Sequence, residues 1–173
     1  MNLVLKATQF AALKHRNQRR KDGKTPYIIH PISVAMILAE IGGIDDPEIL
    51  SAALLHDTIE DTNTSAKELD KEFGSTVRKI VEEVTDNKKL TFSKRKQLQI
   101  DKAPFLSKDA TLVKIADKIS NVSDVIKSPP PEWDQLRCDN YIDWAEAVIK
   151  NCQKVNKKLE KHFFKLLTNY REE

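Results

Sequence analysis

AALLHDTIED (residues 52–61) is the stretch of this 173-residue sequence that decides the fold. It completes a run from Ile49 to Leu55 that is apolar on nearly all sides, which is typical of a helix at the centre of a core. An ionised Asp57 beside such residues is costly unless a partner neutralises its charge. The stretch therefore predicts a buried helix that carries chemically active side chains at its end.

The polar residues of this stretch predict a cation-binding position. If one helix continues to Asp61, Glu60 lies four residues after His56 and shares its face. Asp61 lies four residues after Asp57 and shares its face in the same way. Carboxylates are unfavourable at the C-terminal end of a helix, because the helix dipole is negative there. A divalent cation would remove that cost; the alternative is a helix end that is acidic without a function.

Two residues elsewhere in the sequence fit the same site. His30 follows a loop and begins an amphipathic helix, and Asp117 interrupts the apolar run LVKIADKIS. Taken alone, a histidine at a helix start is more often a cap or a packed core residue than a ligand, and Asp117 is equally explained as a surface position. Combined with His56 and Asp57 they give two imidazoles and two carboxylates, which suit Mn, Fe, Co or Zn better than Ca or Mg. Four protein ligands leave coordination positions for water and substrate.

Apolar periodicity predicts helices along most of the sequence. We expect them over residues 2–17, 30–41, 46–61, 65–73, 75–84, 109–128 and about 134–170, with a partly helical, exposed segment over 88–102. Only 4 glycines are present and no strand is indicated. The predicted fold is all-α, a single-domain bundle of about seven to nine helices covering residues 1–173.

The composition excludes several classes of protein. The net charge of +3, from 29 basic and 26 acidic residues, is too even to predict nucleic-acid binding. Basic residues nevertheless gather at 16–21 and 94–96, which suits a polyanionic small ligand or an ordinary solvated face. No apolar run approaches the roughly 18 residues of a membrane span, and Lys6 interrupts any signal peptide. We expect a cytoplasmic protein, with Cys138 and Cys152 as free thiols.

Four blocks of sequence carry a resemblance to a known family. They are RRKDGKTPYIIHP (19–31), AALLHDTIEDT (52–62), FG…VRKIVEEVTD (73–86) and LVKIADKISN (112–121). A histidine, then a His-Asp pair, then a distant aspartate resembles the HD superfamily of metal-dependent phosphohydrolases. The order of the four blocks resembles the hydrolase domain of the RelA/SpoT-homologue family, most closely its standalone small alarmone hydrolases of the metazoan SpoT-like type.

The resemblance implies an HD-type helical fold and a specific reaction. The implied activity is Mn-dependent hydrolysis of guanosine 3′,5′-bis(diphosphate), ppGpp or pppGpp, to GDP or GTP and pyrophosphate. One Mn²⁺ is implied, with Zn, Fe or Co as alternatives, held by His30, His56, Asp57 and Asp117. Glu60 and Asp61 match the acidic pair that orients or deprotonates the attacking water. The matching substrate-binding residues are Arg20, Lys21, Lys96 and Asn121.

Departures from the family pattern leave other functions open. Val122-Ser123-Asp124 stands where the family usually has Leu-Arg-Asp, Gln97 replaces a basic residue, and Ile29 replaces an asparagine. One alternative is a phosphatase acting on another nucleotide, such as the 2′-phosphate of NADPH or a nucleoside monophosphate. Another is a nucleotide-binding module without catalysis, which the presence of all six metal and acidic residues disfavours. No synthetase domain fits in 173 residues, so we expect degradation of the alarmone and not its synthesis.

Overall fold

The computed structural model describes residues 2–172 as an all-helical fold, which confirms the predicted fold class. Nine of its ten α-helices have eight residues or more, within the predicted range. A π-helical segment (Ile37–Ile41) extends α2, and a 3₁₀ turn (Ala103–Phe105) follows α7. The α-helices are α1 (Leu3–Lys14), α2 (Ile29–Met36), α3 (Pro47–Leu55), α4 (Thr58–Asp61), α5 (Ala66–Phe73), α6 (Ser75–Val84), α7 (Phe92–Lys102), α8 (Lys108–Lys127), α9 (Gln135–Asn151) and α10 (Lys157–Glu172).

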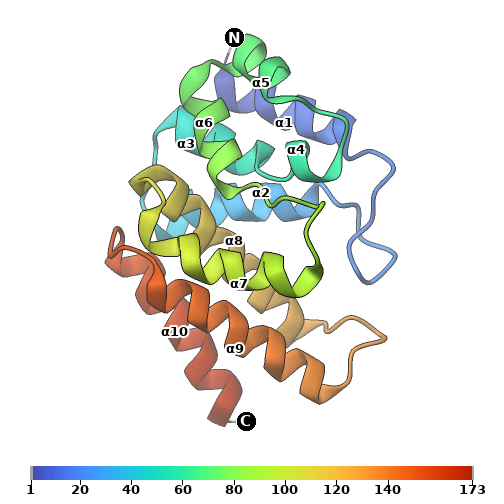
Figure 1. The fold of residues 1–173 in the computed structure, drawn as a ribbon, viewed down its shortest axis with the longest axis vertical. Coiled ribbons are helices and arrows are strands. Elements are labelled where there is room, and N and C mark those ends of the chain that lie inside the picture. The colour runs from blue at the N-terminus through green and yellow to red at the C-terminus, as the bar shows by residue number, and fades with distance from the viewer. Residues whose placement is uncertain (1, 173) are drawn as a thin grey trace.

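Helix α8 runs through the middle of the molecule and joins its two halves (Figure 1). It packs against α2 and α6 on one side and against α9 and α10 on the other. On the far side of α2, α3 contacts both α1 and α6. The buried apolar side chains of the described residues form one cluster. A single domain over residues 1–173 stays a prediction.

The central position of α8 explains its sequence. Ser107 caps its first turn by accepting a hydrogen bond from the Ala110 N–H, and every residue from Ala110 to Ser120 is buried. The buried stretch includes Lys114, Asp117 and Lys118, whose charges require partners inside the protein. α8 therefore brings charged groups into the core at the level of the α3–α4 junction.

The expected continuous helix through residue 61 is wrong. α3 ends at Leu55 and the four-residue α4 begins at Thr58. His56 Nδ1 binds the Ala53 carbonyl oxygen at 2.7 Å, and the Thr58 hydroxyl donates to the Leu55 carbonyl oxygen, also at 2.7 Å. These side chains satisfy the last carbonyls of α3, so the helix ends where the polar residues begin. The break turns His56 and Asp57 toward α8.

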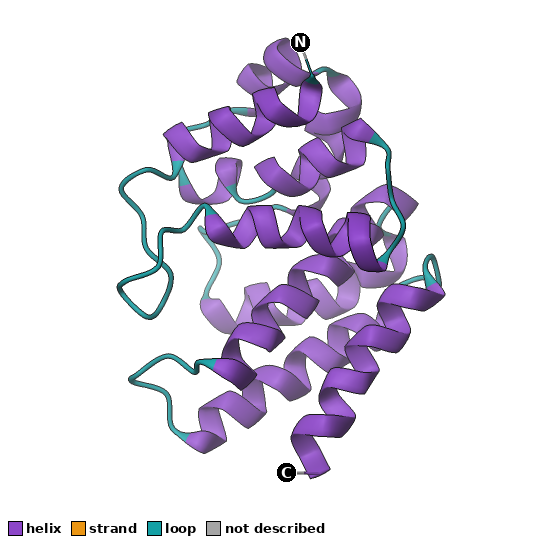
Figure 2. Ribbon diagram, turned by 180° about the vertical axis from the view of Figure 1, so that it is seen from behind, coloured by secondary structure: helices purple, strands orange, loops and turns teal. Residues whose placement is uncertain are grey.

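Two long loops project from the same edge of the molecule (Figures 1 and 2). The first, residues 15–28, contains a turn in which Asp22 accepts hydrogen bonds from the Lys24 and Thr25 N–H groups. Gly23 in this turn has a φ of 70°, a value that favours glycine. The second loop, residues 128–134, is opened by Pro129 after α8. Together they place Lys21 and Trp133 next to one another.

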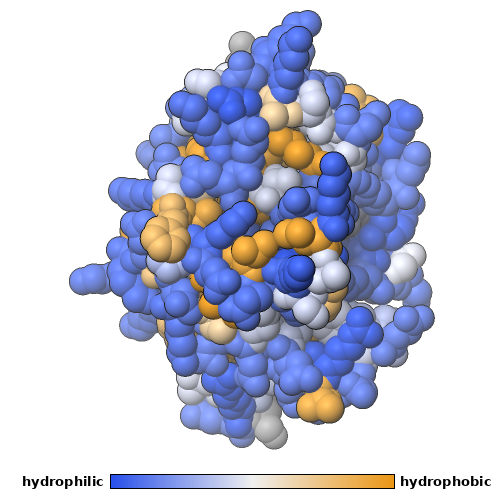
Figure 3. Space-filling model, in the orientation of Figure 1, coloured by the Kyte–Doolittle hydropathy of each residue, from blue (hydrophilic) through white to orange (hydrophobic). Residues whose placement is uncertain are grey.

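The face of the molecule shown in Figure 3 is mainly hydrophilic, with a hydrophobic patch near its middle.

Cys138 and Cys152 are buried free thiols, as expected. Within residues 2–172, no helix combines the length and apolar character needed to cross a membrane.

Candidate active site

Four predicted metal ligands meet at one point between α2, the α3–α4 junction and α8. His30 Nε2 lies 3.1 Å from Asp117 Oδ1 and 3.7 Å from Asp57 Oδ2. His56 Nε2 lies 3.1 Å from Asp57 Oδ2 and 3.6 Å from Asp117 Oδ1. Ligand atoms that share one ion at about 2.0–2.2 Å are about 3.0–3.6 Å from one another, so this spacing fits a single metal ion.

The two imidazole rings are oriented by hydrogen bonds on their far sides. His56 Nδ1 binds the Ala53 carbonyl oxygen, and His30 Nδ1 lies 3.1 Å from Ser120 Oγ. Both Nε2 atoms are thereby directed at the two carboxylates, as in histidines that bind metals. His56 Nε2 is buried and has no hydrogen-bond partner, although it lies between two carboxylate oxygens. A cation at this point satisfies the nitrogen and both carboxylates together, so the residues present fit a divalent metal ion.

The electrostatics of the cluster favour the metal-binding protonation states of its carboxylates. Burial opposes ionisation of Asp57, but the facing histidines hold its pKa below the ordinary value. Burial likewise opposes ionisation of Asp117, but Lys118 and the histidines hold its pKa well below the ordinary value. Burial lowers the pKa of His30, whereas the two carboxylates outweigh burial and raise the pKa of His56 to about 10.

Asp117 is held by two further contacts. Asn121 Nδ2 donates to Asp117 Oδ1 at 2.7 Å, and Lys118 Nζ donates to Asp117 Oδ2 at 2.9 Å. Asn121 Oδ1 in turn accepts a hydrogen bond from Arg20 at 2.9 Å, and Arg20 also pairs with Asp124 at 2.9 Å. The predicted substrate residues Arg20 and Asn121 are thus linked to the metal centre through one chain of hydrogen bonds.

Glu60 and Asp61, the predicted acidic pair, lie in two different environments. Glu60 Oε1 accepts a hydrogen bond from the Asp86 N–H at 2.6 Å, and burial raises the pKa of Glu60 to about 7. Asp61 instead pairs with Lys88 and lies 3.5 Å from the Tyr27 hydroxyl. Carboxylate oxygens of Asp57, Glu60 and Asp61 lie within 4.8 Å of one another. Burial therefore raises the pKa of Glu60 above the ordinary carboxyl range, and its side chain lines a cavity. The carboxylate of Asp61 is instead paired with Lys88.

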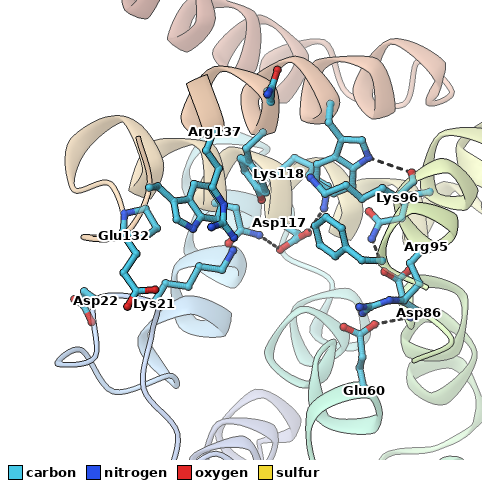
Figure 4. A pocket seen from close by; sticks show the side chains of 18 of the residues that line it. Lys21, Asp22, Glu60, Asp86, Arg95, Lys96, Asp117, Lys118, Glu132 and Arg137 are labelled. Carbon is cyan, nitrogen blue, oxygen red and sulfur yellow. Dashed lines mark hydrogen bonds and ion pairs between the residues drawn. The ribbon is translucent and has the colours of Figure 1, made fainter. Parts of the chain in front are cut away.

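A cavity of about 930 Å³ opens beside the candidate metal centre, and Glu60 and Asp117 line its wall. A second cavity of about 210 Å³, lined by His30 and Arg20, shares Lys21 and Asn121 with the first. Figure 4 shows Glu60, Asp86 and Arg95 together on one side of Asp117, and Lys21 and Arg137 on the other. The cations Lys96 and Lys118 also line the cavity. The larger volume suits a drug-sized or nucleotide-sized ligand.

Aromatic rings hold these cations in place. Lys96 Nζ lies 4.0 Å from the ring centroid of Trp144, and Lys118 Nζ lies 4.7 Å from the same centroid. Lys21 Nζ lies 4.5 Å from the centroid of Trp133. Such cation–π contacts are favourable when partly desolvated. The cavity therefore combines aromatic faces that can stack on a base with ammonium groups that can meet phosphates.

Sequence reasoning missed several cavity residues. Lys118 could have been recognised from the sequence, because it is a charged residue inside the apolar run of α8, directly after a predicted ligand. The sequence pattern did not distinguish Trp133, Tyr141 and Trp144, which also line the cavity, since their spacing fits an ordinary apolar stripe. All of the predicted site residues lie in or beside this site; Asp61 is the one whose side chain is turned toward Lys88 on the surface.

Comparisons with known proteins place the chain in a family. The profile of the HD domain matches residues 7–139. A Xenopus tropicalis protein named guanosine-3′,5′-bis(diphosphate) 3′-pyrophosphohydrolase MESH1 is 52% identical over 159 residues, 91% of this chain and 89% of the relative. The chain belongs to the MESH1 family of HD-domain proteins. Human MESH1 is 51% identical to this chain, and the match covers 94% of this chain and 93% of the human protein.

Solved structures agree with this membership of the MESH1 family. The structure of a metazoan SpoT orthologue that hydrolyses ppGpp superposes with a TM-score of 0.94 at 42% identity, covering 98% of this chain and 96% of that one. The match confirms the predicted resemblance to standalone metazoan SpoT-like hydrolases. It also confirms that the HD fold extends beyond the profile match into α10.

Proposed function

We propose that this chain hydrolyses guanosine 3′,5′-bis(diphosphate) to GDP and pyrophosphate, and pppGpp to GTP and pyrophosphate, with one bound Mn²⁺. The observation that carries the proposal is the meeting of two histidines and two aspartates at the wall of a cavity lined by cations and aromatic rings. The shared names of relatives that are about half identical over nine-tenths of the chain support the choice of substrate.

The proposed metal ligands are His30, His56, Asp57 and Asp117. A divalent ion bound there supplies a Lewis acid that lowers the pKa of a water molecule and stabilises charge on phosphoryl oxygens. Mixed imidazole and carboxylate donors suit Mn²⁺, and also Zn, Fe or Co.

Glu60 is the proposed proton acceptor of the reaction. In the hydrolysis, the water oxygen forms a bond to the phosphorus attached to the ribose 3′-oxygen, and the bond between that phosphorus and the 3′-oxygen breaks. The water loses a proton and the departing 3′-oxygen gains one. A carboxylate with a pKa near 7 that faces the cavity is suited to accept the first proton. Asp61 is the proposed partner that orients the water.

The cationic side of the cavity is the proposed phosphate site. Lys21 and Lys96 lie on aromatic faces and have no carboxylate partner among the described residues, so their ammonium groups are available to phosphates. Asn121 and Arg20 connect this side to Asp117. We propose that the purine ring stacks on one of the aromatic faces between them.

The test is turnover by purified, metal-stripped protein with Mn²⁺ added back, and with Zn²⁺, Fe²⁺ or Co²⁺ in separate samples. Release of GDP and pyrophosphate from ppGpp only after metal addition supports the proposal. NADPH is assayed in parallel. Phosphate release from NADPH without hydrolysis of ppGpp would instead identify a metal-dependent phosphatase. Binding of ppGpp without turnover would identify a binding module.

The proposed substrate is a small nucleotide. A cytoplasmic location, without membrane or nucleic-acid partners, stays a prediction.

The pH dependence of substrate capture follows from Lys96. Burial, reinforced by Lys118 and Lys21, lowers the pKa of Lys96 to about 8. The ammonium charge is therefore lost as pH rises through about 8, and kcat/KM for ppGpp should fall there by about tenfold, the value of one charged hydrogen bond. Lys96→Arg keeps its charge and should remove this decline. Lys94→Arg, on the exposed face of α7, is the matched control and should keep the wild-type pH profile.

A further inference from the structure

Tyr27 lies near the end of the loop that carries Arg20 and Lys21, next to the candidate metal centre. Its hydroxyl donates a hydrogen bond to Asp57 Oδ2 over 2.6 Å. We propose that Tyr27 is a positioning residue that holds Asp57 in the orientation that binds the metal ion. The inference rests on the proposed metal-dependent function and assigns to that site a residue outside the ligand set.

The bonded oxygen is the one that faces the metal position. Asp57 Oδ2 lies 3.1 Å from His56 Nε2 and 3.7 Å from His30 Nε2. A carboxylate oxygen has two lone-pair directions. The hydrogen bond from Tyr27 occupies one of them and leaves the other directed at the histidines. Since the terminal torsion of an aspartate is broad, loss of this bond lets the carboxylate rotate away from the metal position.

Tyr27 is itself fixed by the surrounding structure. Its N–H donates to the Gln18 carbonyl oxygen at 3.0 Å, and its own carbonyl oxygen accepts from the His30 N–H at 3.0 Å. The ring lies against His15, with ring centroids 4.9 Å apart. A side chain held on several sides can impose an orientation on its partner, which a mobile surface hydroxyl cannot do.

The hydroxyl and the ring of Tyr27 have separate roles. The hydroxyl also lies 3.5 Å from Asp61 Oδ2, and the much shorter contact to Asp57 takes its single proton. The ring face lies 5.4 Å from the guanidinium carbon of Arg20, which is linked to Asn121. Removing the hydroxyl alone should therefore affect the metal, whereas removing the ring should also disturb the substrate side.

The experiment compares Tyr27→Phe with Tyr170→Phe. Tyr170 on α10 donates a hydrogen bond of 2.7 Å to Asp139, so its replacement removes an equivalent bond near the C-terminal end, away from the metal centre. Mn²⁺ binding to the metal-stripped proteins is measured by calorimetry. We expect Tyr27→Phe to weaken Mn²⁺ affinity by about 10–100-fold, the usual effect of losing a group that orients a ligand. Tyr170→Phe should bind Mn²⁺ as the wild type does.

Steady-state kinetics at saturating Mn²⁺ supply the second readout. Tyr27→Phe should lower kcat and leave KM for ppGpp unchanged, because the ring under Arg20 is kept; Tyr27→Ala should raise KM as well. Equal Mn²⁺ affinity of Tyr27→Phe and wild type would overturn the positioning role while leaving the proposed function standing. A wild-type protein that binds no Mn²⁺, Zn²⁺, Fe²⁺ or Co²⁺ would overturn the proposed function itself.

Discussion

Asp57→Ala should abolish hydrolysis of ppGpp, with a loss of at least about 10³-fold in kcat/KM. The substitution removes one of the four proposed metal ligands, a carboxylate that faces both histidines. Metal ions supply several kcal/mol of catalysis in such sites, and each ~1.4 kcal/mol corresponds to tenfold in rate. His30→Ala removes another of the proposed ligands and should have the same effect.

Metal binding gives this prediction a readout that is independent of turnover. A ligand at about 100 times its Kd stabilises the folded protein by about 2.7 kcal/mol, so Mn²⁺ should raise the Tm of the wild type. It should leave the Tm of Asp57→Ala unchanged. Asp70→Ala, which removes a carboxylate paired with Arg78 at the surface over 3.0 Å, is the matched control and should keep both turnover and the Mn²⁺-dependent Tm. Full activity of Asp57→Ala would show that the metal lies elsewhere.

The convergence of the four proposed metal ligands was predictable because each lies in a local pattern that the core dictates. His30 begins a helix with one apolar face, and Asp117 lies within a buried helix, so both are carried to the centre by the burial of their neighbours. The end of α3 was not predictable from periodicity. It depends on the hydrogen bonds of His56 and Thr58 to backbone carbonyl oxygens, which compete with the next helical turn.

The cationic side of the cavity was predictable only in part. Lys96 was recognised through a resemblance, but its position depends on Trp144, which lies 48 residues further along the chain. Contacts of this range arise from the packing of α7 on α9 and leave no trace in either local pattern. Arg20 is the opposite case: the resemblance assigns it to the nucleotide, whereas in the structure its guanidinium is bound to Asn121 and Asp124.

Glu60→Gln should lower kcat by about 10²–10⁴-fold, the range for loss of a general base, and should leave Mn²⁺ affinity unchanged. Glutamine keeps the size of the side chain and an oxygen that can accept the Asp86 N–H bond, but it cannot take a proton. Glu60 is not one of the four side chains that meet at the proposed metal position. Unchanged Mn²⁺ affinity would therefore distinguish Glu60→Gln from Asp57→Ala. Glu132→Gln, which removes a carboxylate from the rim of the same cavity, is the matched control.

The pH profile tests the assignment of the proton acceptor to Glu60 over Asp61. Burial raises the pKa of Glu60 to about 7, so its carboxylate takes up a proton as pH falls through that value and activity should decline on the acid side. The charge of a bound divalent cation moves this decline to lower pH, by favouring the ionised carboxylate. Glu60→Gln should lose the acid-side decline and keep a low, flat rate. If Asp61→Asn flattened the profile and Glu60→Gln preserved it, Asp61 would be the acceptor, and its pairing with Lys88 would have to break during the reaction.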